Sequence, residues 1–268
     1  MALHFCQMNS PASWRLSAVS FFNTTPLVYG LENDPEIRIR FGVPSTLLDD
    51  LILNRSDVAL LPVIDLQKLA GLRVLPGIGI GCDGPTLTVR LFSRTPISQT
   101  RILAVDPDSH TSVILARLIF QHRFHLCPEL IDLSQAQDQP YETRLLIGDK
   151  VVTSSPEGFA YQLDLGEAWK QLTGLPFTFA IWTLRPDAPV GNLARKLEAA
   201  LHNGLAHLDD LIRIHAIPRG WPEHLARQYL TRYLRFQLTP EHLQAIRLFH
   251  QMAHRSGLIP HCYPLQLV

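Results

Sequence analysis

The stretch RILAVDPDSHTSVILARLIFQH, residues 101–122, shows the pattern that decides the fold. Residues 101–105 are almost entirely apolar and predict a buried strand. Polar and turn-forming residues follow, and the apolar residues between Thr111 and His122 then recur at helical spacing. A strand, a short loop and a helix in this order form the unit from which parallel α/β sheets are built.

The same alternation extends outward through the first two-thirds of the chain. Strands are expected at 15–21, 37–43, 58–61, 78–81, 87–92, 145–147 and 177–182, with helices at 27–31, 44–52 and 167–172. After Pro186 the pattern becomes helical, and helices are expected at 193–208, 222–234 and 240–256. We therefore predict an α/β fold with mostly parallel sheets, helices on both faces and a helical C-terminal tail.

Composition excludes several classes of protein. The 268 residues are 46% hydrophobic, which supports a sizeable core and excludes general disorder. Lys and Arg total 24, as do Asp and Glu, so the basic excess typical of nucleic-acid binders is absent. No apolar run reaches the ~18–20 residues of a membrane span, and the first residues do not resemble a secretory leader. We expect a cytoplasmic protein with neither a membrane nor a nucleic-acid partner.

The usual sequence markers of metal and cofactor chemistry are missing. The four cysteines form no C-x-x-C pair and are interpreted as reduced, structural thiols. His250 and His254 are spaced i, i+4 and could share a metal ion. They form no H-E-x-x-H motif, and no carboxylate is spaced to complete a metal site, so a solvated helix face is the preferred interpretation. The chain contains no G-x-S-x-G or P-loop motif, and GIGCDG (79–84) has the G-x-G-x-x-G spacing but precedes a predicted strand instead of a helix. We therefore predict neither a metal nor a cofactor.

Two predicted helix starts carry polar side chains at positions that favour an anion. The first contains Ser20 and Asn23, and the second contains Ser109, Thr111 and Ser112. Free backbone N–H groups and the helix dipole attract negative charge at such ends, and each start follows a strand, where ligands of α/β sheets bind. Taken singly, each is more simply an ordinary N-cap. Facing one cleft, the two would hold a ligand with two carboxylates.

Further polar or glycine positions lie next to predicted strands. Gly84 permits a tight turn and close approach of a ligand, and Thr88 is expected to begin the next strand with its hydroxyl directed at the cleft. Gly148 and Asp149 follow another strand, and Ser45 opens a helix. A plain structural role as turn, cap or solvated residue stays open for each of them. The residues alone indicate a two-lobed α/β protein that holds a small anion.

Short segments spread over almost the whole chain resemble the chorismate dehydratase family of the futalosine route to menaquinone. They are VSFFNTTPL (19–27), VPS (43–45), DVALLPV (57–63), DGP (83–85), DP and TSV (106–107 and 111–113), LLIGD (145–149), DLGEAW (164–169), TGLPF (173–177) and SGLI (256–259). The resemblance implies a two-lobed, periplasmic-binding-protein-like type II fold. Lobe one would comprise residues 1–92 and 183–268, and lobe two residues 93–182, with the substrate cleft between them. It also implies an intracellular enzyme, not a transport receptor.

The family reaction converts chorismate into 3-[(1-carboxyvinyl)oxy]benzoate and water, so the resemblance implies a carbon–oxygen lyase. Loss of the C3 proton and the C4 hydroxyl makes the ring aromatic. The protein then needs mainly to hold the carboxylates, stabilise a dienolate and place a base. No histidine, glutamate or lysine stands out as that base. We hypothesise that the enolpyruvyl carboxylate of the substrate accepts the proton.

The resemblance makes Asn23 and Thr88 the predicted catalytic residues, although the family carries a serine where this chain has Thr88. The predicted substrate-binding residues are Ser20, Ser45, Gly84, Ser109, Thr111, Ser112, Gly148 and Asp149. Thr25 and His110 stand where arginine is frequent. The anion is therefore expected to depend on backbone N–H groups and hydroxyls.

Two other functions stay open. The sister enzyme of the same route makes 1,4-dihydroxy-6-naphthoate from a cyclised futalosine derivative, and it would present a histidine in the pocket of lobe two. Here Gly148 and Asp149 follow Ile147, and no histidine lies nearby in the sequence. The second alternative is a non-catalytic protein that binds a small anion. The sequence predicts no oligomeric state, but a hinge of two chain crossings favours closure of the lobes on ligand.

Overall fold

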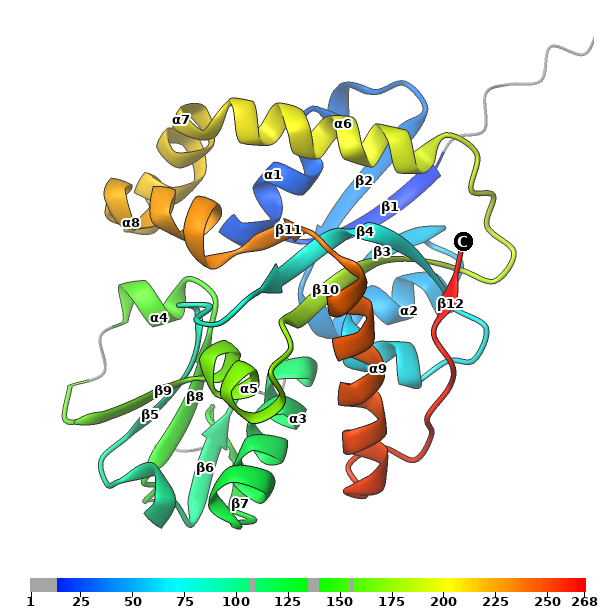
Figure 1. The fold of residues 1–268 in the computed structure, drawn as a ribbon. Helices are drawn as coiled ribbons and strands as arrows, with labels where there is room; N and C mark the ends of the chain where they lie inside the picture. Colours follow the sequence, from blue (N-terminus) through cyan, green and yellow to red (C-terminus); the bar gives the residue numbers. More distant parts are fainter. Residues whose placement is uncertain (1–13, 107–108, 135–139, 155–156) are drawn as a thin grey trace, which may run out of the picture.

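Two mixed β-sheets form the framework of the computed structural model, which describes residues 14–106, 109–134, 140–154 and 157–268 (Figure 1). Cys6 and the rest of the predicted leader lie outside the described residues, as do Pro107 and Asp108 of the second predicted helix start. The larger sheet has the strand order β11-β4-β10-β3-β1-β2, with β12 beside β4. The smaller sheet has the order β7-β6-β8-β5-β9.

The strands of the larger sheet are β1 (Trp14–Val19), β2 (Ile37–Gly42), β3 (Val58–Pro62), β4 (Arg73–Cys82), β10 (Phe177–Leu184), β11 (Arg235–Gln237) and β12 (Gln266–Leu267). Those of the smaller sheet are β5 (Val89–Ser93), β6 (Ile102–Val105), β7 (Glu129–Asp132), β8 (Thr143–Ile147) and β9 (Tyr161–Asp164). β1 pairs in parallel with β2 and β3, and β6 with β7 and β8. The prediction of mostly parallel sheets is wrong, because β10 runs antiparallel to both β3 and β4, and β5 to both β8 and β9.

The helices are α1 (Thr25–Val28), α2 (Leu47–Ile52), α3 (His110–Ile119), α4 (Lys150–Thr153), α5 (Leu165–Thr173), α6 (Leu193–Ala206), α7 (Leu208–Leu211), α8 (Glu223–Gln228) and α9 (Pro240–Arg255). The predicted helical tail is confirmed by α6, α8 and α9. α9 begins and ends as its sequence indicates: the Thr239 N–H donates to His242 Nδ1, and Gly257 adopts a positive φ of 66°. No helix in the described part of the chain is long and apolar enough to cross a membrane.

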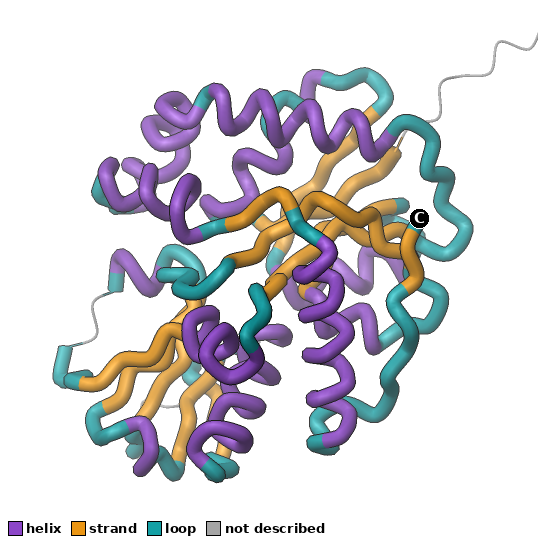
Figure 2. The backbone as a smooth tube through the Cα atoms, viewed as in Figure 1, coloured by secondary structure: helices purple, strands orange, loops and turns teal. Residues whose placement is uncertain are grey.

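Two apolar cores hold the layers together. One lies between the larger sheet and the helices α1, α6 and α8, which cover the same face of it (Figure 2). Trp182 of β10, Leu197 of α6 and Leu27 of α1 are fully buried there. The other core joins both sheets, because Leu61 of β3 and Leu103 of β6 belong to it together with residues of α2, α3, α5 and α9.

The chain passes between the sheets twice. β5 (Val89–Ser93) belongs to the smaller sheet, and β10 (Phe177–Leu184) belongs to the larger one. The crossings therefore lie in the segments 82–89 and 164–177. The division into lobes at residues 92 and 182 stays a prediction, and both crossings precede it by a few residues.

Candidate active site

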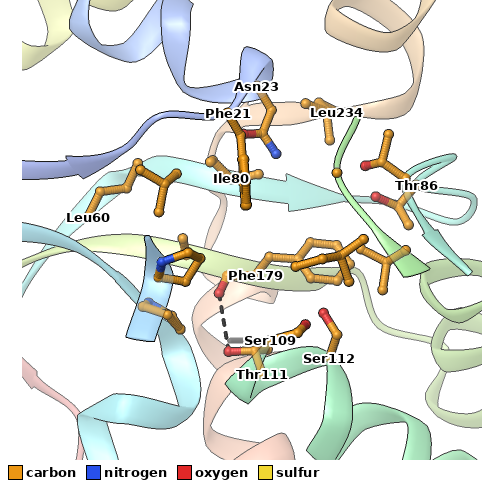
Figure 3. Close-up of a pocket in the computed structure, with 18 of the residues that line it drawn as sticks. Phe21, Asn23, Leu60, Ile80, Thr86, Ser109, Thr111, Ser112, Phe179 and Leu234 are labelled. Carbon is orange, nitrogen blue, oxygen red and sulfur yellow. Dashed lines mark hydrogen bonds between the residues drawn. The ribbon is translucent and has the colours of Figure 1, made fainter. Parts of the chain in front are cut away.

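A pocket is lined by residues of both sheets (Figure 3). Six of the residues predicted from the sequence line it: Asn23, Thr88, Ser109, Thr111, Ser112 and Gly148. The two predicted helix starts therefore do face one cavity. Apolar side chains form most of the remaining wall, among them Phe21, Leu60, Ile80, Phe179 and Leu234.

Asn23 and Thr88 meet at the hydroxyl of Tyr229, which the sequence analysis did not identify. Asn23 Nδ2 donates to Tyr229 Oη at 3.2 Å, and Thr88 Oγ1 lies 2.7 Å from the same oxygen. Tyr229 lines the pocket at the start of the π-helical turn Tyr229–Tyr233, and only 1% of it is exposed. Burial raises the pKa of its phenol, although the hydrogen bonds that it shares with Thr88 and Asn23 partly oppose the shift. The phenol is therefore protonated at neutral pH.

The loop before β5 is held by the buried carboxylate of Asp164. This carboxylate caps α5 by accepting from Gly166 N and Glu167 N, and it also accepts from Thr86 N and Leu87 N at 2.8–3.1 Å. Leu87 has a φ of 70°, and Thr88 N donates to Thr86 O across it, which forms a tight and strained γ-turn. Asp164 thus places both threonine hydroxyls at the pocket.

Asp164→Ala is expected to destabilise the fold by about 3 kcal/mol, since it removes a helix cap and leaves the N–H groups of Thr86 and Leu87 without their acceptor. Urea denaturation measures the loss. Asp164→Asn keeps one acceptor oxygen and should lose less. A stability of Asp164→Ala equal to that of the parent would show that the loop does not depend on this carboxylate.

The start of α3 approaches the pocket from the side opposite Asn23 (Figure 3). Ser109, Thr111 and Ser112 are all buried there. Thr111 Oγ1 accepts from Ile64 N at 3.4 Å and donates to the carbonyl of Phe179 at 3.5 Å, which ties α3 to the larger sheet. The first N–H groups of an α-helix have no acceptor within the helix, so this end offers backbone donors and a positive dipole to an anion.

His110, also at the start of α3, is held by Asp65, which follows β3 of the larger sheet. Its Nδ1 lies 2.9 Å from both carboxylate oxygens of Asp65, which is fully buried, and Lys68 Nζ lies 2.7 Å from the same carboxylate. The imidazole is thereby held at the edge of the pocket, where His110 is one of the lining residues. The sequence analysis considered His110 only as a replacement for arginine.

Four predicted residues are not among those that line the pocket: Ser20, Ser45, Gly84 and Asp149. Ser20 is exposed, and its carbonyl accepts from Arg219 at 3.4 Å. Ser45 is half-buried in the 3-10 turn Pro44–Thr46. Gly84 is buried with a φ of 103°, so it serves the turn that precedes Thr86.

Asp149 lies behind the pocket wall. Its Oδ1 accepts from Trp221 Nε1 at 2.9 Å, and Arg219 Nε lies 3.6 Å from its Oδ2. Trp221 stacks on Tyr229 with ring centroids 5.0 Å apart. Burial raises the pKa of Asp149, while Trp221 and Arg219 oppose the shift. Asp149 therefore contacts the pocket indirectly, through an aromatic stack.

Few titratable groups face the pocket. Of the described residues that line it, only His110 and Tyr229 carry one. No group of three or more His, Cys, Asp or Glu side chains within the described ranges is placed to hold a metal ion. The interpretation of His250 as part of a solvated helix face is wrong: it is 2% exposed, its Nε2 donates to Val63 O at 2.7 Å, and its Nδ1 accepts from Gln67 Nε2 at 2.8 Å. His254 is exposed, as predicted.

Comparison with known proteins places the chain in a family. A sequence profile described as menaquinone biosynthesis matches residues 14–255. The chain belongs to this menaquinone biosynthesis family. A protein of Thermus thermophilus named chorismate dehydratase is 26% identical over 233 residues, which are 78% of this chain and 84% of that protein. A chorismate dehydratase of Campylobacter jejuni is 26% identical over 169 residues, 60% of this chain and 63% of that protein.

Solved structures show the fold of this menaquinone biosynthesis protein. A crystal structure of an Archaeoglobus fulgidus protein superposes with a TM-score of 0.74 at 18% identity, covering 92% of this chain and 99% of that one. The periplasmic aliphatic sulphonate binding protein SsuA of Escherichia coli superposes with a TM-score of 0.69 at 16% identity, covering 97% and 94%. The predicted two-lobed, periplasmic-binding-protein-like fold is confirmed.

Proposed function

We propose that this protein is a chorismate dehydratase, a cytoplasmic hydro-lyase of the futalosine route that converts chorismate into 3-[(1-carboxyvinyl)oxy]benzoate and water. Membership of the menaquinone biosynthesis family and two relatives named chorismate dehydratase support the proposal. The observation that carries it is a single pocket in which the Asn23 amide, the Thr88 hydroxyl and the start of α3 come together.

The pocket suits a small, largely apolar ring that carries two carboxylates. Phe21, Ile80 and Phe179 supply flat or aliphatic walls for the ring. The start of α3 offers hydroxyls and N–H groups on one side, and Asn23 offers an amide on the other (Figure 3). Each side thus provides uncharged donors to one end of a dianion. This agrees with the sequence, which has Thr25 and His110 where arginine is frequent.

The pocket supports substrate-assisted proton transfer. Its lining contains no carboxylate, lysine or arginine among the described residues, Tyr229 is protonated, and His110 Nδ1 contacts both Asp65, at 2.9 Å, and Lys68 Nζ, at 3.0 Å. In the proposed mechanism the enolpyruvyl carboxylate of chorismate takes the C3 proton in preference to His110 Nε2, and the electron pair enters a dienolate on the ring carboxylate. The C4–O bond then breaks, and the departing hydroxyl leaves with its electron pair and takes up the proton as water. The protein orients the groups and stabilises the developing charge.

Incubation of the purified protein with chorismate tests the proposal. We expect an aromatic product lighter than chorismate by one water, followed by ultraviolet absorbance and mass spectrometry. Chorismate that binds but stays unchanged would identify a non-catalytic binding protein instead.

Asp149→Asn is expected to keep turnover within about threefold of the parent, because an amide oxygen still accepts from Trp221 and the carboxylate is not needed as a base. The measurement is kcat and KM for chorismate. If this variant bound chorismate normally but did not turn it over, the substrate would not be its own base.

One observation favours the sister enzyme as a second candidate. That enzyme is expected to present a histidine in the pocket of lobe two, and the structure brings His110 there although none is near Gly148 in the sequence. Incubation with the cyclised futalosine derivative distinguishes the two, since only the sister enzyme would release a dihydroxynaphthoate from it.

A further inference from the structure

The hydrogen bonds of Tyr229 have a defined direction. An amide nitrogen has no acceptor lone pair, so Asn23 Nδ2 donates and Tyr229 Oη accepts at their 3.2 Å contact. The assignment of that nitrogen agrees with its neighbour, because Thr24 Oγ1 donates to Asn23 Oδ1 at 3.4 Å. One lone pair of the phenol oxygen is thereby used, and its proton needs an acceptor elsewhere.

That acceptor is Thr88. Tyr229 is 1% exposed, and its ring packs on Trp221 and Phe22 at centroid distances of 5.0 and 6.3 Å. Within the described part of the chain, its other hydrogen-bond partner is Thr88 Oγ1, at 2.7 Å. If Thr88 donated to Tyr229, the phenol proton would have no acceptor among the described protein groups, which is costly for a side chain that is 1% exposed. Tyr229 therefore donates to Thr88.

A hydroxyl that accepts one hydrogen bond still has its own proton to donate. Thr88 lines the pocket, so its proton is available to a ligand there. The γ-turn at Leu87 and the bond from Gly148 N to Thr88 O, at 2.9 Å, fix its backbone. The branched side chain of threonine also restricts rotation about χ1 more than serine does. Asn23 thus donates to Tyr229, and Tyr229 donates to Thr88. This series of hydrogen bonds polarises the Thr88 hydroxyl, which is the donor presented to the pocket.

We propose that Tyr229 is a positioning residue that holds Thr88 as the hydrogen-bond donor to the departing C4 hydroxyl of the substrate. This inference rests on the proposed dehydratase function. As the C4–O bond breaks, negative charge develops on the leaving oxygen, and the Thr88 O–H stabilises it without giving up its proton. The proton that completes the water is the one that the substrate carboxylate took from C3, so the step balances with no further reactant.

Tyr229→Phe, Thr88→Val and the double variant test this order. Tyr229→Phe should lower kcat for chorismate about 10- to 100-fold with KM changed less than about threefold, and Thr88→Val should lower kcat at least as much. The double variant should be no slower than Thr88→Val, because the tyrosine acts through the threonine. Thr88→Ser should keep most of the activity. Tyr233→Phe, on the same helical turn but outside the pocket lining, should match the parent.

Parent-like kcat in Tyr229→Phe, or losses that multiply in the double variant, would overturn the proposal. Thermal unfolding without ligand separates this from failure of the proposed function. Thr88→Val should lower the Tm by about 3 °C, and adding Tyr229→Phe should restore part of it, because the unpaired phenol is removed. If the double variant recovers part of the Tm while the parent leaves chorismate unchanged, the donation from Tyr229 to Thr88 stands and the role in dehydration is overturned. If the double variant recovers none of the Tm, the donation from Tyr229 to Thr88 is itself overturned.

Discussion

Asn23→Ala is expected to lower kcat/KM for chorismate tenfold to a hundredfold or more. The amide donates to Tyr229 and lines the pocket, so its loss removes a donor to the substrate and also the first member of the chain that ends at Thr88. A hydrogen bond to a charged group contributes about 1.5–3 kcal/mol, which corresponds to this range of rates. Steady-state kinetics with chorismate measures the effect.

Asn33→Ala provides the matched control. Asn33 is exposed in the turn Leu31–Asn33, away from the pocket, and its variant should show the kinetics of the parent. If Asn23→Ala turned chorismate over at the rate of the parent, the assignment of this asparagine to the active site would be wrong.

Acidification is expected to destabilise the protein through His250. Burial lowers the pKa of this imidazole to about 4 in the folded state, against about 6.5 in an unfolded chain. Below pH 6.5 the unfolded chain therefore binds a proton that the folded protein does not. The contribution is fully present above about pH 6.5 and is lost as the pH falls toward 4. The loss is about 2 kcal/mol at pH 5 and about 3 kcal/mol at pH 4.

Urea unfolding at pH 7.5 and pH 5 checks this, with two variants for comparison. His250→Gln keeps a donor for the Val63 carbonyl and has no titration, so it should be less stable than the parent at pH 7.5 and lose less stability on acidification. His254→Gln, which alters an exposed side chain, should retain the pH dependence of the parent. An equal loss of stability in parent and His250→Gln would show that another group is responsible.

Periodicity predicted the elements that bury a face. β1, β3, β6 and β10 carry dense apolar runs, and α9 has both its caps and its stripe in the sequence, so each was found within a few residues. The short strands β7, β9, β11 and β12 were missed. They have two to four residues and owe their conformation to the ladder beside them, not to a pattern of their own.

The site was predictable where one segment carries the signal. Asn23, Thr88 and the start of α3 each lie at the end of a strand, and the family resemblance pointed to the same places. Tyr229 lies 141 residues from Thr88, and an aromatic residue at helical spacing is typical of a core position. Its role depends on tertiary contact alone. The same holds for the hydrogen bonds that Asp164 accepts from Thr86 N and Leu87 N, because its position at a helix start predicts only a cap.

The position of β10 in the larger sheet has a consequence for folding during translation. β10 lies between β3 and β4, and it is made only after the whole of the smaller sheet. On the ribosome, β3 therefore lacks its partner on one side until residue 184 has emerged, and β4 waits for the same strand. The nascent chain exposes unpaired strand edges and the apolar residues of half a core during this interval. The central strand of the larger sheet is thus synthesised after both of its neighbours, and only β11 and β12 of that sheet follow it.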